Sequence, residues 1–196
     1  MRIRWVVLYA LLFLALVGVR VEAQLPPPSG NTLLLSTFGD GVQIYASVED
    51  TANPGQFVWL FQSPRADLFE GPAEQTLLGT HYAGPTWEAN DGSTVVGMRI
   101  DMAPSPHPDS IPQLLLKGSS HTGDGLFSDV TFIQRLDTVG GVMPATPPTG
   151  LGEVREVPYT ATYNFFVAVP EPGALALLIG LALPGAILLA RRTARA

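Results

Sequence analysis

The segment Val157-Pro158-Tyr159-Thr160-Ala161-Thr162-Tyr163-Asn164-Phe165 carries the clearest structural signal in the chain. Tyr159, Ala161, Tyr163 and Phe165 alternate with polar or smaller residues. Successive side chains of a β-strand point to opposite faces, so this period of two predicts a strand with one buried face. We therefore expect the chain to build its core from the faces of strands.

Further strands are predicted upstream, each bounded by turn residues. Short apolar or alternating runs predict strands at residues 42–48, 57–61, 76–82, 94–102 and 126–134, and residues 113–117 fit a strand or one helical turn. Asp91-Gly92 is typical of a hairpin, and Gly39-Asp40-Gly41 predicts another turn. We expect residues 63–74 to be irregular and residues 140–156 to form a long loop. Between the two ends no helical period persists, which predicts a single all-β domain, either a sandwich or a barrel.

The two ends of the chain predict export. Arg2 and Arg4 precede an apolar run, and small residues around Ala23 predict a signal peptide at residues 1–23, with cleavage after Ala23. Near the other end, an uncharged apolar run at residues 173–190 is followed by arginines. As a helix this run is about 27 Å long, close to the hydrocarbon thickness of a bilayer. Positive charge favours the cytoplasmic side, so we expect a transmembrane helix with the body outside the inner membrane.

The tail resembles the PEP-CTERM sorting signal of Gram-negative bacteria that make extracellular polysaccharide. The residues that carry the resemblance are Pro170, Glu171, Pro172, the apolar helix, and the terminal cluster that includes Arg191 and Arg192. The resemblance implies recognition of residues 169–196 by an exosortase, a membrane protease-transpeptidase. It also implies anchoring in the inner membrane before processing, and later transfer to the cell surface or extracellular matrix.

The body between these ends is acidic. Six of the 11 basic and two of the 17 acidic residues lie in the ends, so residues 24–168 carry 15 acidic and 5 basic side chains. This charge repels phosphate backbones and argues against nucleic acid as a partner. Divalent cations can bridge such a surface to acidic polymers, so extracellular polysaccharide is a possible partner. The chain has no cysteine, so no disulfide stabilises it.

Residues 41–168 resemble the family DUF3455, a domain of unknown function, and residues 24–40 read as a leader or linker. Among the motifs that carry the resemblance are Gln43-Ile44-Tyr45, Phe57-Val58-Trp59, His81-Tyr82-Ala83-Gly84-Pro85-Thr86-Trp87, Asp91-Gly92-Ser93, Ile133-Gln134-Arg135 and Val157-Pro158-Tyr159-Thr160-Ala161. The resemblance implies a secreted β-rich protein without an established activity. It also implies that relatives carry two cysteines near the positions of Ser47 and residues 149–152. Without that pair, the loop at 140–156 is expected to be looser here.

One polar and aromatic cluster offers candidate chemistry: His81, Trp87, Glu88, Asp91 and Ser93. In the functional interpretation His81 is a base oriented by the carboxylate of Glu88 or Asp91, and Trp87 forms a wall for a sugar ring or aromatic group. Ser93 would add a binding contact. In the structural interpretation the cluster is a hairpin with Trp87 in the core.

Arg135 follows an apolar strand and offers two interpretations. It either forms a structural ion pair with Asp137 or Asp129, or it binds an anion. The three histidines of the body lack the short spacing of a zinc site, and neither a phosphate-binding glycine loop nor a nucleophile elbow is present. We therefore predict no metal and no cofactor.

Two hypotheses of function follow. The favoured one is an exported protein of the cell envelope or extracellular matrix, with a structural or binding role. The alternative is a secreted hydrolase or lyase that acts on carbohydrate or a related polymer and is centred on His81.

Overall fold

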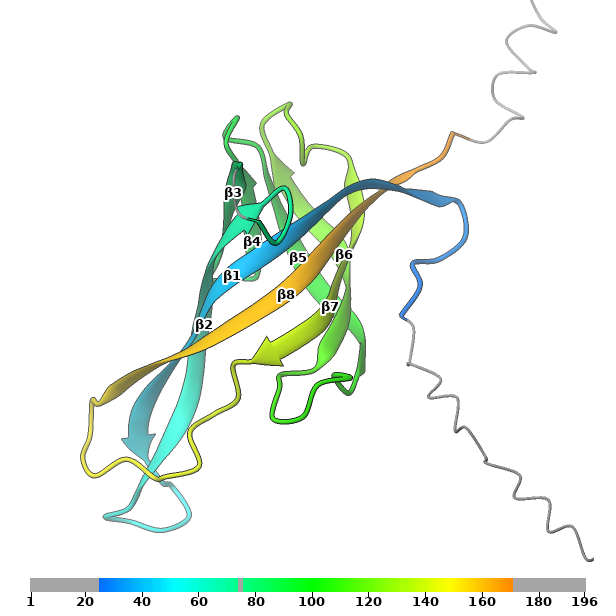
Figure 1. Cartoon of the computed structure of the whole chain (residues 1–196). Helices are drawn as coiled ribbons and strands as arrows, with labels where there is room; N and C mark the ends of the chain where they lie inside the picture. The colour runs from blue at the N-terminus through cyan, green and yellow to red at the C-terminus, as the bar shows by residue number, and fades with distance from the viewer. Residues whose placement is uncertain (1–24, 74–75, 171–196) are drawn as a thin grey trace, which may run out of the picture.

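The computed structural model describes residues 25–73 and 76–170 (Figure 1). The predicted signal peptide and cleavage at Ala23 lie outside the described residues. So do the predicted transmembrane helix and most of the sorting signal, including Glu171, Pro172, Arg191 and Arg192. The described part contains no helix long and apolar enough to cross a membrane.

The described residues form eight antiparallel strands in one closed barrel, and each strand pairs with the next along the chain. The strands are β1 (Asn31–Glu49), β2 (Phe57–Phe69), β3 (Leu77–Tyr82), β4 (Thr86–Ala89), β5 (Thr94–Ala103), β6 (Gln113–Thr122), β7 (Val130–Gly140) and β8 (Val154–Ala168). The barrel closes because β8 pairs with β1. The all-β prediction is confirmed, and of its two architectures the single-sheet barrel is correct rather than the sandwich.

The predicted turn at Gly39-Asp40-Gly41 is wrong, because β1 runs straight through it. Residues 31–40, which were assigned to a leader, are the first half of this strand. These glycines serve close packing rather than turning. A Cβ atom on Gly39 would lie 2.6 Å from the ring of Tyr163, and one on Gly41 would lie 2.1 Å from the carbonyl oxygen of Arg65. The alternating β8 packs tightly across this part of β1.

Several other boundaries differ from the prediction, and β6 extends past residue 117 to Thr122. Residues 63–69, expected to be irregular, belong to β2, and Pro64 is tolerated because β3 pairs with β2 only from Ala66 to Phe69. Opposite Pro64, β3 therefore has no carbonyl group that would need an N–H from β2, and the missing N–H of proline costs no ladder hydrogen bond. The strand expected from residue 126 begins only at Val130, and the segment before it turns inward.

One end of the barrel is closed by aromatic packing. Tyr159, Tyr163 and Phe165 of β8 are buried, which confirms the alternation seen in the sequence. Phe127, from the β6–β7 connection, is fully buried and stacks on Phe165 with ring centroids 4.5 Å apart. Phe127 therefore closes the end of the barrel at the β6–β7 connection.

The other half of the barrel is open on one side. β3 and β4 are short, so the ladders pair β2 with β3 only at residues 66–69 and β4 with β5 only at residues 94–96. Residues 57–65 of β2 and 98–103 of β5 keep a ladder partner on one side alone. Figure 1 shows the β3–β4 hairpin near one end, while β1, β2 and β8 extend farther toward the other end. This geometry leaves an opening between β2 and β5.

Candidate functional site

A cavity of about 560 Å³ lies inside the barrel at this opening. Its rim includes the exposed residues Phe61 and Gln62 of β2 and Arg99 and Met102 of β5. Its deeper wall includes four residues that are buried in the barrel core: His81, Trp87, Leu116 and Tyr163. The volume falls in the range of small-molecule sites, and the lining is mostly apolar with a few polar groups, as in such sites.

His81 forms part of the deep wall in its neutral form. Its side chain is 3% exposed, and its ring stacks on Trp87 with centroids 4.3 Å apart and planes 10° apart. The pKa of His81 is lowered to about 3, mainly by burial and to a smaller extent by the charge of Arg135. The hydrogen bond to the Thr86 carbonyl partly opposes this lowering. Because the carbonyl oxygen of Thr86 lies 2.8 Å from Nδ1, that nitrogen carries the proton of the neutral ring.

The predicted catalytic partners of His81 do not converge on it. Glu88 follows the inward-facing Trp87, so its side chain lies on the outer face of β4, where it accepts a hydrogen bond of 2.7 Å from the hydroxyl of Tyr82. Asp91 lies in the β4–β5 turn and accepts hydrogen bonds from Ser93 and from the backbone N–H of Leu126. The described residues therefore do not assemble the histidine–carboxylate arrangement that the enzymatic interpretation requires.

Asp91 and Ser93 instead hold the closed end of the barrel. The hydroxyl of Ser93 donates to Asp91 at 2.6 Å and accepts the backbone N–H of Phe127 at 3.0 Å. The hydrogen bonds that Asp91 accepts from the Ser93 hydroxyl and from the backbone N–H groups of Leu126 and Ser93 lower the pKa of Asp91. Together with the bond from Phe127 to Ser93, they fix the connection that inserts Phe127 into the core. Ser93 does not line the cavity, whereas Trp87 both belongs to the core and lines the cavity.

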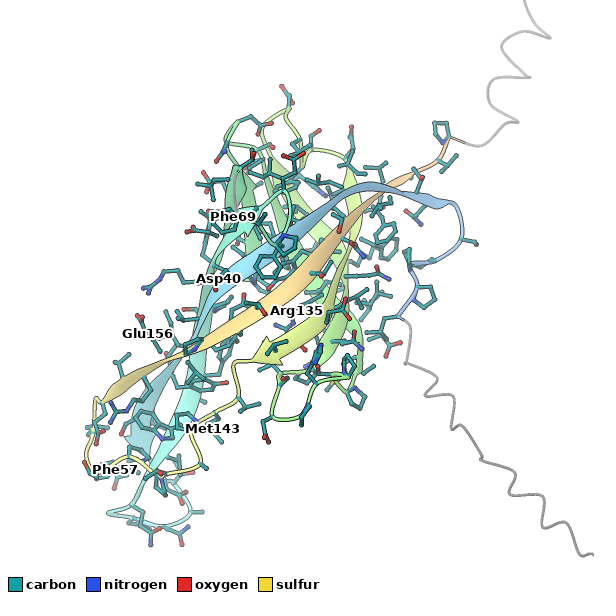
Figure 2. The ribbon with its side chains drawn as sticks, viewed as in Figure 1. Asp40, Phe57, Phe69, Arg135, Met143 and Glu156 are labelled. Atoms are coloured by element: carbon teal, nitrogen blue, oxygen red, sulfur yellow. The ribbon has the colours of Figure 1, made fainter. Side chains whose placement is uncertain are left out.

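The predicted ion pair of Arg135 with Asp137 or Asp129 is wrong. Within residues 25–73 and 76–170, Arg135 forms no salt bridge. Its Nε and Nη2 atoms donate to the carbonyl oxygen of Pro112 at 3.3 and 2.8 Å. Asp137 has a backbone φ of 48°, and Asp129 lies in the connection before β7. Arg135, labelled in Figure 2, is among the residues that line the cavity, so a cation faces the cavity without a carboxylate partner.

The charge of Arg135 acts on several neighbours. Burial raises the pKa values of Tyr159, Tyr163 and Tyr45, and the positive charge of Arg135 opposes this rise at all three hydroxyls. The same charge disfavours protonation of His81. The charge of Arg135 therefore acts on His81 and on three tyrosines of the barrel.

Most residues of the cavity were not singled out as site residues from the sequence, among them Gln43, Arg99 and Tyr163. Gln43 appeared only within a family motif, and it is 4% exposed, with a side-chain Nε2 that has no hydrogen-bond partner in the described part of the chain. Arg99 stands between Met98 and Ile100 in a predicted strand. An arginine inside such an apolar run, in an acidic chain, is the one signal that could have identified it.

Ser47 lies against the segment where the family resemblance implied a second cysteine. Its hydroxyl donates to the carbonyl oxygen of Gly150 at 2.5 Å, and its backbone N–H bonds to the carbonyl of Glu153 at 2.8 Å. The hydroxyl of Tyr45 and the indole N–H of Trp59 also bond to carbonyls of this connection, at Gly141 and Thr146. Hydrogen bonds thus join these two regions, and the expected looseness of the loop stays a prediction.

The remaining histidines do not add to the site. His107 is exposed, and Nε2 of His121 lies 2.7 Å from the carbonyl oxygen of Val130. In the part of the chain that the structure describes, no three side chains of His, Asp or Glu gather in a way that could hold a metal ion.

Comparison with known protein families gives a match over most of the chain. A model of the family described as "Protein of unknown function (DUF3455)" matches residues 28–167. This span begins just before β1 and ends at residue 167, so it covers the barrel strands except for the last residue of β8. No curated protein and no solved structure matches the chain.

Proposed function

We propose that this chain, which belongs to the DUF3455 family of proteins of unknown function, is an exported binding protein. Its ligand would be a small, largely apolar molecule that enters the barrel between β2 and β5. The observation that carries the proposal is the cavity of about 560 Å³, which opens where the two strands lack a second ladder partner.

The surfaces of the cavity support this proposal over a purely structural role. Barrel interiors of this size are ordinarily filled by side chains or reserved for one small ligand. Here Leu114, Leu116 and Ile111 supply apolar walls, and Trp87 and Tyr163 supply aromatic ones. Exposed apolar side chains at the rim, Phe61 and Met102, are about half exposed and would be covered by a bound molecule.

The arrangement of the polar groups favours binding over catalysis. A general base needs a partner within hydrogen-bond reach and a pKa near the working pH. His81 donates its one ring proton to a backbone carbonyl, its pKa is lowered to about 3, and no carboxylate of the described residues lines the cavity. No observation favours the alternative of a hydrolase or lyase.

The location is part of the same proposal. The charged and apolar N-terminal segment, the PEP-CTERM-like tail and the acidic body are the observations that favour export, sorting by an exosortase-type protease, and delivery to the cell surface or extracellular matrix. Cell fractionation tests this part. We expect the barrel in the envelope or matrix fraction, and disruption of the exosortase should leave it in the inner membrane. Recovery of the intact chain from the cytosol would refute it.

Binding is tested with the neutral fluorescent probe phenylnaphthylamine and the full chain in zwitterionic lipid nanodiscs, with empty nanodiscs as background. We expect saturable binding that Leu114→Trp abolishes, because this substitution adds an indole to the cavity wall. Leu151→Trp is the matched control, since Leu151 is 71% exposed on the β7–β8 connection. Equal binding by both variants and the native chain would refute the cavity as the site.

A further inference from the structure

The distribution of positive charge in the barrel is uneven. Residues 24–168 hold only five basic side chains: Arg65, Arg99, Lys117, Arg135 and Arg155. Two of these five, Arg99 and Arg135, line the one cavity described above, although the body as a whole is strongly acidic. In so acidic a body, the attraction between opposite charges would place arginines beside surface carboxylates instead.

The arginines outside the cavity do have carboxylate partners. Arg65 pairs with Glu156 at 2.8 Å, and Arg155 pairs with Glu153 at 3.8 Å. Within residues 25–73 and 76–170, neither Arg99 nor Arg135 forms a salt bridge, and no Asp or Glu lines the cavity. Arg99 is exposed and Arg135 is half-buried, and the hydrogen bonds of Arg135 to the carbonyl oxygen of Pro112 leave its charge uncompensated, so both charges can attract an anion that enters the cavity.

The strand registers place Arg99 and Arg135 on either side of the same part of β6. Arg99 of β5 lies across from Leu116 of β6, and Arg135 of β7 lies across from Leu114 of β6. Leu114 and Leu116 are two residues apart, so both face the cavity, and the two arginines flank them from opposite sides. An anionic group above these leucines is within the field of both cations.

Two other side chains that line the cavity, Gln43 and Trp87, carry buried donors. Gln43 lines the cavity from β1 and is 4% exposed, and its Nε2 has no hydrogen-bond partner in the described residues. The indole Nε1 of Trp87, 1% exposed, also lacks a partner there. Both nitrogen atoms are almost wholly inaccessible to solvent, and Gln43 also interacts with the hydroxyl of Tyr159, so neither donor is offered to the cavity and the positive polarity of the site comes from the two arginines.

From these contacts we infer that the cavity binds an organic anion, an apolar or aromatic body that carries one carboxylate or sulfonate between Arg99 and Arg135. This inference rests on the proposed binding function and names its ligand class. The apolar walls take the body of the molecule. The guanidinium of Arg135, whose Nη1 is not used in the bond to Pro112, takes the anionic group, as arginine does in charge-assisted pairs.

The test compares two probes that share a scaffold and differ by the charged group: anilinonaphthalene sulfonate and neutral phenylnaphthylamine. Dissociation constants are measured for the full chain in zwitterionic nanodiscs, by energy transfer from tryptophan to the probe. The quantity of interest is the ratio of the constant for the neutral probe to that for the anion. In Arg135→Met we expect this ratio to fall roughly 10- to 100-fold, the loss of one hydrogen bond to a charged group.

Three controls make each outcome decisive. Arg135→Lys keeps the charge and should keep most of the ratio, and Arg65→Met, which removes an exposed arginine from a surface pair, should leave it unchanged. Retained binding of the neutral probe shows that a variant is folded with its cavity intact. Should Arg135→Met bind neither probe, Arg99→Met, at the exposed rim, provides the second measurement, with the same direction expected.

The two proposals fail in different ways. If the neutral probe binds in the cavity but the ratio is the same in the native chain, Arg135→Met and Arg99→Met, the anion inference is overturned and the binding function stands. If neither probe binds the native chain, the binding function itself is overturned.

Discussion

Lowering the pH to about 5 should destabilise the barrel through His81, whose neutral ring is buried against Trp87. The pKa of His81 falls from its ordinary 6.5 to about 3 in the folded protein. Between these two values the unfolded chain binds a proton that the folded chain does not. The contribution of His81 to stability is therefore fully present above pH 6.5 and is lost progressively as the pH falls toward 3.

The loss of unfolding free energy is set by the number of pH units between the ordinary pKa of 6.5 and the lower pH. One pKa unit corresponds to about 1.4 kcal/mol, so going from about pH 7.5 to about pH 5 should remove roughly 2 kcal/mol of unfolding free energy. Few aspartate or glutamate side chains titrate in this interval, because their ordinary pKa values lie near 4. The step is large against a typical total of about 5–15 kcal/mol.

Urea unfolding of the full chain, followed by near-ultraviolet circular dichroism at the two pH values, measures the step. His81→Phe keeps an aromatic ring on Trp87 but cannot titrate, so its step should vanish whatever its stability at neutral pH. His107→Phe, at an exposed position, should keep the native step. A native step below about 0.5 kcal/mol, or an equal step in His81→Phe, would refute the reasoning.

Three further substitutions test the packing of the barrel by the same urea titrations. Gly41→Ala should lower the free energy of unfolding by about 1–3 kcal/mol or more, because the new Cβ would lie 2.1 Å from the carbonyl oxygen of Arg65. Gly150→Ala is the control and should cost little, because Gly150 has open space around it. Equal effects would contradict the close approach of β1 and β2. Ser93→Ala should cost about 1–3 kcal/mol, because it leaves the buried N–H of Phe127 without an acceptor, and a neutral result would show that Phe127 is held by packing alone. Ser47→Ala should cost about 1 kcal/mol and speed proteolysis of the β7–β8 connection, since its bond to Gly150 is lost; an unchanged cleavage rate would argue against that contact.

The outcome for the site shows where sequence patterns stop being informative. Trp87 and Arg135 were singled out from the sequence, and both line the cavity. The roles of Glu88, Asp91 and Ser93 were not predictable, because closeness along the chain does not imply closeness in space. Glu88 follows Trp87 directly, yet strand alternation sends its side chain to the outer face. Asp91 and Ser93 bond instead to Leu126 and Phe127, more than thirty residues away in the chain.

The sequence by itself determined the all-β class, the inward face of β8, the hairpin at Asp91-Gly92 and the acidity of the body. These features are local or additive, so a period of two, a turn dipeptide or a charge count is enough to reveal them. Only the tertiary structure decided that β1 continues through Gly39 and Gly41, that β8 closes the barrel onto β1, and that a cavity opens between β2 and β5. It also decided that Arg99 and Arg135 share that cavity without a carboxylate. The physical reason is that the neighbours of a side chain in a barrel come from strands paired across long stretches of chain, and no local pattern records which strands will pair.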